Sequence, residues 1–453
     1  MELNFKELVK NYYEEALETL IKDLSINSVY DASTVTSETP YGKGVNDCFT
    51  FLKEIALKDG FKVDTCDGRC LEIEYGEGEK LIYVLAHQDV VPVVPENWKY
   101  GPFNPTIVDD VLYARGTSDD KGPGIASYYA LKALKDNGLI KGFRVRLVFG
   151  GDEERGSSCL NYYFHTLKKE DPTFGFTPDG DFPLIFGEKG ITNYWYKGHK
   201  VFDDIVYIKA GTVLNTVIDK CDVKVKNPTM LQAYLDNHSG IKYEKLEEDV
   251  FRFIGHAAHG AMPEIGINAG IIGLSVLGST YNIPELSLLA NEYSEVHGKN
   301  MYVYFNTPNL HETTYNVGKI SYEDGVFEMG VNFRYPENVK VDEVINKIQD
   351  CSPFPIHYEK GSDCLYFDPE LPFIKTLAKV YVDETGDTVN KPMTIGGGTY
   401  AKEAKNTIAF GSHFPGKVDH IHEEDEKIDL EDFYNSISIY AHAIYALGNL
   451  NEN

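Results

Sequence analysis

Three short apolar runs stand out in the first half of the chain, at residues 81–86, 145–149 and 174–177. None shows the regular polar alternation of a strand with one wet face, so each is typical of a strand in a sheet covered on both sides. Helical periodicity flanks them at 46–59 and 122–135. The pattern therefore predicts an α/β layer structure in this half of the chain.

Amphipathic helices are also predicted at both ends of the chain. Residues 3–24 place their apolar side chains on one helical face with Lys and Glu opposite. Near the other end, 372–383 reads as a helix and 407–410 as a strand. A last helix is expected to begin at Asp429, as its N-cap, with Asp432 at the third helical position.

The pattern changes between about 190 and 364. Strand-like alternation occurs at 221–226 and 327–333, and helical spacing occurs near 268–279 and 341–350. A mixture of alternating strands and separate helices is typical of an α+β domain.

We therefore expect a discontinuous domain, residues 1–188 and 366–453, into which a second domain, residues 189–365, is inserted. A chain of 453 residues is long enough for two or three domains, each with its own core.

The composition of the chain indicates which partners and which cellular compartment to expect. The formal charge of 43 − 70 = −27 argues against nucleic acid as a partner, although bound divalent cations would neutralise part of it. We see neither a signal-peptide pattern nor the ~20 apolar residues that a membrane helix needs. Seven scattered cysteines, an odd number, favour reduced thiols, so we expect a cytoplasmic protein.

Candidate metal ligands gather where the predicted strands end. In sheets of this kind, ligands collect beyond the carboxyl ends of the strands, so these side chains should meet around one point. Imidazole and carboxylate groups meeting in this way predict a metal site. The groups are His87-Gln-Asp89, Arg115-Gly-Thr-Ser-Asp-Asp-Lys-Gly122, Gly151-Asp-Glu-Glu154 and Pro178-Asp179.

Each group also has an ordinary structural explanation when taken alone. His87 fits a satisfied histidine at a strand end, and the acidic pair 119–120 fits a helix N-cap. The acidic pair 153–154 fits a solvated surface, and Asp179 fits a turn. These explanations weaken together because all the groups stand where apolar strands end.

The ordered set of motifs resembles the co-catalytic zinc amidohydrolases, which include aminoacylases, carnosinases and bacterial peptidase V-type dipeptidases; the last group is the most similar. The resemblance spans nearly the whole chain, and no single motif is specific alone. The motifs are Ala86-His-Gln-Asp-Val-Val-Pro92, Gly116-Thr-Ser-Asp-Asp-Lys-Gly122, Gly151-Asp-Glu-Glu154, Thr177-Pro-Asp179, Ala258-His-Gly260 with Gly266-Ile-Asn-Ala269, Asn332-Phe-Arg-Tyr-Pro336, Gly396-Gly-Gly-Thr-Tyr400 and His422-Glu-Glu-Asp-Glu426.

The resemblance implies a mixed sheet sandwiched by helices in a catalytic domain, with an inserted α+β lid domain. It also implies two divalent metal ions, most commonly Zn²⁺, with Mn²⁺ or Co²⁺ as alternatives. Asp119 would bridge them. Asp119, Glu154 and His422 would hold one ion, and His87, Asp119 and Asp179 the other.

Two further roles follow from the same resemblance. Glu153 would act as general base and later protonate the leaving amine, and Asp89 would orient His87. The peptide bond between residues 119 and 120 is typically cis in the family.

The lid and the glycine turn would supply the substrate contacts. His259 and Asn215 would stabilise the oxyanion, although the Asn215 match is loose. Arg334, Gly398 and Thr399 would hold the terminal carboxylate of the substrate.

Some assignments keep an alternative. His256 lies beside His259, and His420 lies beside His422; in each pair the second fits the motif better. Arg334 could instead form a salt bridge within its own domain.

The function that the resemblance implies is a metal-dependent dipeptidase acting on small peptides. An N-acyl amino acid deacylase with the same metals, and a catalytically silent binding protein, remain alternatives. Because the insert is large, as in peptidase V, we expect a functional monomer.

Overall fold

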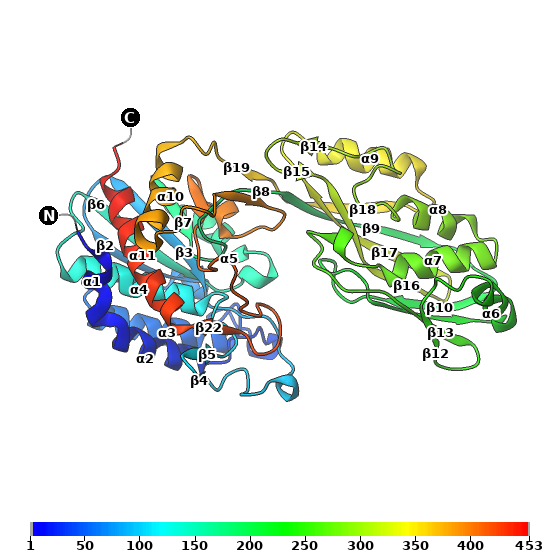
Figure 1. Ribbon diagram of the computed structural model, residues 1–453, viewed down its shortest axis with the longest axis horizontal. Coiled ribbons are helices and arrows are strands. Elements are labelled where there is room, and N and C mark those ends of the chain that lie inside the picture. The colour runs from blue at the N-terminus through cyan, green and yellow to red at the C-terminus, as the bar shows by residue number, and fades with distance from the viewer. Residues whose placement is uncertain (1–2, 452–453) are drawn as a thin grey trace. The chain divides into compact units, whose positions relative to one another are not determined.

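The computed structural model describes residues 3–451, and the chain divides into two compact units. The first unit comprises Met1–Phe186, Phe367–Met393 and Thr399–Asn453. The second comprises Gly187–Tyr366 together with the short segment Thr394–Gly398. Figure 1 shows the elements of both units.

A mixed sheet forms the centre of the first unit, in the order β1-β2-β6-β3-β7-β21-β8. Strands β6, β3, β7 and β21 are parallel neighbours, whereas β1, β2 and β8 pair antiparallel. The strands of this sheet are β1 (Lys62–Asp64), β2 (Cys70–Gly76), β3 (Lys80–His87), β6 (Phe143–Gly150), β7 (Phe174–Thr177), β8 (Ile185–Glu188) and β21 (Thr407–Ala409).

Strand β8 continues into the second unit, where its last residues pair with β19 (Leu365–Tyr366). A separate three-stranded sheet joins β4 (Thr106–Val108), β5 (Val111–Tyr113) and β22 (Lys427–Asp429), and β20 is Met393–Ile395. The helices of the first unit are α1 (Phe5–Val9), α2 (Tyr13–Leu24), α3 (Lys43–Lys58), α4 (Lys121–Asp136), α5 (Ser158–Asn161), α10 (Pro372–Thr385) and α11 (Leu430–Asn449).

Helices α4 and α11 pack on the central strands β3 and β6, so the predicted α/β layer with its mixed sheet is confirmed. The approach is close at Gly124 of α4, where an added Cβ would lie 2.7 Å from the ring of Phe149. Only glycine allows the helix to pack this near the sheet.

Two local predictions need correction. The helix expected over residues 3–24 is interrupted by a 3₁₀ turn, Lys10–Tyr12, between α1 and α2. Asp429 occupies the N-cap position of α11, but its side chain makes no capping hydrogen bond because it pairs with Lys417.

No helix within residues 3–451 has both the length and the apolar composition to cross a bilayer.

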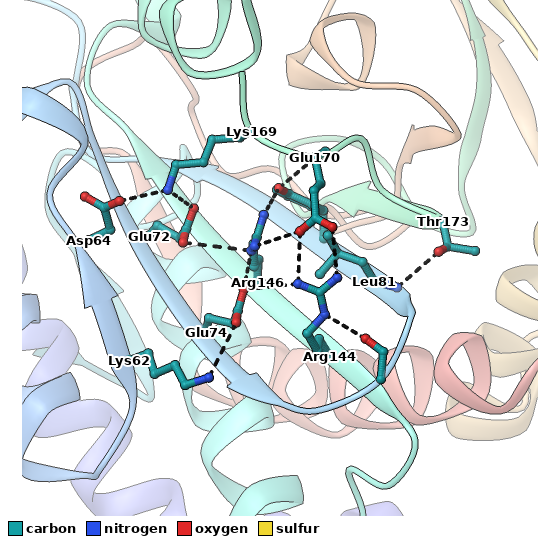
Figure 2. Close-up of polar contacts among 12 residues, drawn as sticks. Lys62, Asp64, Glu72, Glu74, Leu81, Arg144, Arg146, Lys169, Glu170 and Thr173 are labelled. Atoms are coloured by element: carbon teal, nitrogen blue, oxygen red, sulfur yellow. Dashed lines mark hydrogen bonds and ion pairs between the residues drawn. The ribbon is translucent and has the colours of Figure 1, made fainter. Parts of the chain in front are cut away.

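Charged side chains on β2 and β6 form ion pairs with one another and with Lys169 and Glu170 (Figure 2). The strand register places Glu74 opposite Arg146, and their side chains form an ion pair. Arg146 also donates to the hydroxyl of Tyr83 at 2.9 Å and to Glu170 at 3.1 Å, while Lys169 contacts Glu72 at 2.9 Å. The network balances cations against carboxylates, so it joins the sheet to the 162–173 segment rather than binding an external ion.

The second unit is built on an antiparallel sheet in the order β12-β13-β11-β10-β16-β17-β9-β18. Helix α7 packs on β11, β13 and β16, and α9 packs on β18. This is the predicted α+β domain. Its elements are β9 (Gly190–His199), β10 (Ile205–Ala210), β11 (Lys220–Val225), α6 (Pro228–Asp236), β12 (Tyr243–Lys245), β13 (Val250–Ile254), α7 (Ala269–Thr280), α8 (Pro284–Glu292), β14 (Asn306–Thr307), β15 (His311–Glu312), β16 (Thr314–Glu323), β17 (Val326–Tyr335), α9 (Val341–Cys351) and β18 (Ile356–Ser362).

Candidate metal centre

Side chains from five segments of the first unit meet at one edge of its sheet. His87 ends β3, and Asp119 lies in the turn before α4. Glu154 lies in a 3₁₀ turn after β6, Asp179 follows β7, and His422 stands in the loop before β22. Because β3, β6 and β7 run parallel, their carboxyl ends point to the same edge, which brings these residues together.

Asp119 lies between two histidines. Its Oδ1 is 2.9 Å from Nε2 of His87, and its Oδ2 is 2.9 Å from Nε2 of His422. His422 Nε2 is also 3.1 Å from Oε1 of Glu154, and His87 Nε2 is 3.8 Å from Oδ2 of Asp179. One carboxylate oxygen of Asp119 thus faces His87 and the other faces His422, the arrangement that a bridging ligand between two cations requires.

The imidazole of His87 shows why a cation fits here. Its Nδ1 lies 2.9 Å from the backbone oxygen of Asp89, so Nδ1 carries the proton and Nε2 presents a lone pair. Among residues 3–451, this buried Nε2 has no hydrogen-bond partner of acceptable geometry, although the Asp119 carboxylate is adjacent. A lone pair facing a carboxylate is stable when a cation lies between them, so the donor set fits a metal ion.

Asp89 fastens two parts of the site. Its Oδ1 accepts the backbone N–H of Glu153 at 3.0 Å, and its Oδ2 accepts that of Glu154 at 3.1 Å. The same Oδ1 lies 3.4 Å from Nδ1 of His87. The carboxylate therefore holds the turn that carries the two glutamates, while its backbone oxygen holds the histidine ring.

Asp120 also serves the site rather than the helix. It occupies the N-cap position of α4 but makes no side-chain capping bond. Instead its Oδ2 accepts the backbone N–H of His87 at 3.0 Å. The N-cap explanation of the 119–120 pair is therefore wrong for this side chain. The peptide bond between Asp119 and Asp120 is cis, as expected.

The acids of the site stand close together and largely out of water. Burial, reinforced by the charge of Asp119, raises the pKa of Glu154 to about 7 and that of Asp179 to about 6. Burial also raises the pKa of Glu153 well above its usual range. Burial opposes ionisation of Asp119 too, yet the neighbouring His422 keeps its pKa well below normal. The Glu154 side chain is only 10% exposed, so it is not part of a solvated charge pair.

One oxygen of Glu153 lies within 4.8 Å of ligand atoms on His87 and Asp179. A second group within this distance is His87, Asp119 and Glu154. Glu153 therefore borders the cluster, and distance alone leaves both a ligand and a base role open to it.

The structure separates the two C-terminal histidines. His422 lies in the cluster, whereas His420 Nδ1 contacts Glu423 Oε2 at 3.0 Å on the surface. Of the two, only His422 is within 4 Å of a cluster carboxylate among the described residues.

In the second unit, His259 and Asn215 belong to adjoining segments. His259 pairs with Thr216 in an isolated β-bridge, and the N–H of Gly260 donates to the backbone oxygen of Asn215 at 2.6 Å. An added Cβ on Gly260 would lie 2.9 Å from that backbone, so the close approach requires glycine. His256 pairs instead with Ile267.

Arg334, near the end of β17, is buried without a carboxylate partner. It donates from Nε to Asn332 at 2.8 Å and from Nη1 to the carbonyl of Gly396 at 2.6 Å. No Asp or Glu within residues 3–451 forms an ion pair with it, so the salt-bridge alternative is wrong. Burial lowers the pKa of this guanidinium to about 10. A buried, uncompensated cation is a favourable site for an incoming anion.

The glycine turn is divided between the units. Gly398 belongs to the second unit and Thr399 to the first. The hydroxyl of Thr399 accepts the N–H of Ala401 at 3.1 Å and so caps a short 3₁₀ turn.

Sequence reasoning missed how two acids support the site. Asp120 positions His87, and Glu426 lies buried beneath the turn that carries Asp119. Both stand within the recognised motifs, but adjacency to a ligand cannot tell which side chain turns inward.

Known proteins are similar to this chain along nearly its full length. Residues 83–446 match the model described as "Peptidase family M20/M25/M40". A protein of Staphylococcus haemolyticus (strain JCSC1435), described as "Putative dipeptidase", is 36% identical over 471 aligned residues, covering 98% of this chain and 99% of that protein. A protein of Staphylococcus aureus (strain USA300) with the same description is 34% identical at the same coverage.

Solved structures share the fold at lower identity. An M20 family metallo-carboxypeptidase from Sulfolobus solfataricus superposes with a TM-score of 0.62 at 19% identity, covering 96% of this chain and all of that one. Human carnosine dipeptidase 1 gives 0.59 at 13% identity, covering 98% of each chain. At such identities the likeness extends to the fold alone.

The two C-terminal histidines offer a matched pair for testing metal binding. His422→Ala removes a nitrogen that lies 2.9 Å from Asp119 and 3.1 Å from Glu154, so we expect the affinity for one divalent metal ion to fall at least about tenfold. His420→Ala, two residues away, should leave zinc binding unchanged. Titration of the metal-free chain against a chromophoric chelator measures both. An equal or larger loss in His420→Ala would contradict the assignment.

Proposed function

Because the chain belongs to the peptidase family M20/M25/M40, we propose that it is a metal-dependent dipeptidase that hydrolyses the peptide bond of dipeptides. The observation that carries the proposal is Asp119, whose two oxygens each lie 2.9 Å from a different histidine. Relatives described as "Putative dipeptidase" match 98% of the chain.

We propose that Asp119, Glu154 and His422 hold one divalent ion and that His87, Asp119 and Asp179 hold the other. Zinc suits this mixture of imidazole and carboxylate, and manganese or cobalt would also be accepted. When bound, such ions polarise an amide carbonyl and lower the pKa of a water molecule.

Glu153 is proposed as the general base. Its carboxylate borders the cluster, and burial raises its pKa, which favours a group that takes a proton and later returns it. In this role Glu153 accepts a proton from water and gives it to the nitrogen of the leaving amine. Asp89 supports the step by holding the backbone N–H of Glu153.

The second unit supplies groups suited to the substrate's own charges. We propose that His259 and Asn215 stabilise the oxyanion. Arg334 would bind the C-terminal carboxylate of the dipeptide, with the glycine turn through Gly398 and Thr399. Arg334 suits this role because no protein carboxylate among the described residues pairs with it. One chain contains every proposed group, so we propose a functional monomer.

A substrate panel tests the function. We expect the metal-loaded protein to cleave unblocked dipeptides at least about 100-fold faster than N-acetylated amino acids, since a dipeptidase binds both ends of its substrate. Chelation should abolish the activity, and added zinc or manganese should restore it. Faster cleavage of N-acetylated amino acids would identify a deacylase instead, and no hydrolysis of either class by the two-metal protein would favour a silent binding protein.

Adjacent glutamates provide the test of the base. Glu153→Ala should keep close to two metal ions and lower kcat by a factor of about 10² to 10⁴, the usual contribution of a general base. Glu154→Ala, in the neighbouring position, should lose metal. Metal analysis and steady-state kinetics distinguish the two. A fully active Glu153→Ala enzyme, or one that loses a metal ion, would overturn the assignment.

Removal of the buried guanidinium tests the carboxylate clamp. Arg334→Ala should chiefly raise KM for dipeptides, by about 10-fold or more, because it deletes a charge-assisted contact. Dipeptide amides, which lack the carboxylate, should be cleaved equally by both enzymes. An unchanged ratio of dipeptide to amide turnover would rule out the clamp.

A further inference from the structure

Glu426 is a buried carboxylate that touches none of the metal-ligand side chains directly. Its side chain has no exposed surface and stands four residues after His422. It lies under the turn that leads into α4, and it is absent from the candidate ligand groups found among the described residues. A carboxylate so buried needs hydrogen-bond donors or an opposite charge, and the groups that provide them indicate its role.

The backbone of the turn surrounds this carboxylate. Oε1 accepts the N–H of Ser118 at 2.9 Å and that of Asp119 at 3.2 Å, and Gly116 N–H lies 3.1 Å from both oxygens. Oε2 accepts Nη1 of Arg115 at 2.6 Å. Three N–H groups of one turn directed at one anion form a concave nest, which here is filled by the protein's own side chain.

Neighbouring bonds join the same two segments. The N–H of Ala114 donates to the backbone oxygen of Glu426 at 3.1 Å, and the hydroxyl of Ser118 donates to that of Lys427 at 2.9 Å. Arg115 donates from Nη2 to the carbonyl of Glu423 at 2.9 Å. Hydrogen bonds on both sides of Glu426 thus join the turn that carries Asp119 to the loop that carries His422.

This placement has an electrostatic consequence. The N–H groups of the turn carry partial positive charge, and they point at Glu426 rather than toward the cluster. The ion pair with Arg115 neutralises the carboxylate, so Glu426 adds no net negative charge beside the acids of the site. An apolar residue here would leave three N–H groups and a guanidinium without their acceptor, and a neutral polar one would leave the guanidinium without its counter-charge.

We propose that Glu426 is a positioning residue that fixes Asp119 and His422 at the separation required by the metal ion between them. It acts through the backbone of the turn and through its own short connection to His422. The inference rests on the metal site of the proposed function and adds to it a residue that controls metal affinity without contacting metal.

The test compares Glu426→Gln with Glu423→Gln in the full chain. Glutamine keeps the size of the side chain but removes its charge, so we expect zinc affinity at the site of Asp119, Glu154 and His422 to fall about 10- to 100-fold, as for other groups that support ligands. Glu423 lies in the same segment with a largely exposed side chain, and Glu423→Gln should leave the zinc affinity unchanged. Chelator competition on the metal-free protein gives the affinities without reference to activity.

Two further readouts separate positioning from simple structural support. At saturating zinc, Glu426→Gln should recover kcat with KM unchanged, and the visible spectrum of its cobalt form should differ from that of wild type. Glu426→Asp, which keeps the charge, should have an intermediate affinity and provides the measurement if glutamine prevents folding. Lower thermal stability with wild-type zinc affinity in either variant would overturn the proposal. A wild-type chain that binds no zinc would refute the proposed function itself.

Discussion

The structure depends on one carboxylate being shared between two histidines from distant parts of the chain. Asp119 presents one oxygen to His87 and the other to His422, each at 2.9 Å. Several more acids border the same point, and their mutual repulsion would drive them apart without a counter-charge. To keep these acids close together, the protein therefore needs both a bound cation and rigid surrounding loops.

Buried carboxylates that do not face the cluster supply that rigidity. Asp89 accepts two backbone N–H groups of the turn after β6, and Asp120 accepts the backbone N–H of His87. Glu426 accepts the N–H groups of the turn before α4. In each case an acid from one segment fixes the main chain of another segment, the one that carries a ligand side chain.

The sequence was informative where a local pattern has a single physical outcome. Apolar runs that lack alternation became β3, β6 and β7 of a sheet covered by helices, because only burial on both faces tolerates such strands. It was less informative at ends and corners. The helix at 3–24 breaks at Lys10–Tyr12, and Asp429 pairs with Lys417 instead of capping α11, because tertiary partners outcompete local preferences.

The sequence by itself determined the class of fold and the kinds of side chain that gather at the strand ends, because periodicity and residue type are local properties. Only the tertiary structure decided which of two neighbouring acids or histidines turns inward. It separated His422 from His420, gave Asp120 to the backbone of His87, and left Arg334 without a carboxylate among the described residues. The physical reason is that direction and partner depend on chain segments that lie tens to hundreds of residues apart, as Asp120 and His87 or Asp119 and His422 do, and these segments meet only when the sheet and its loops have formed.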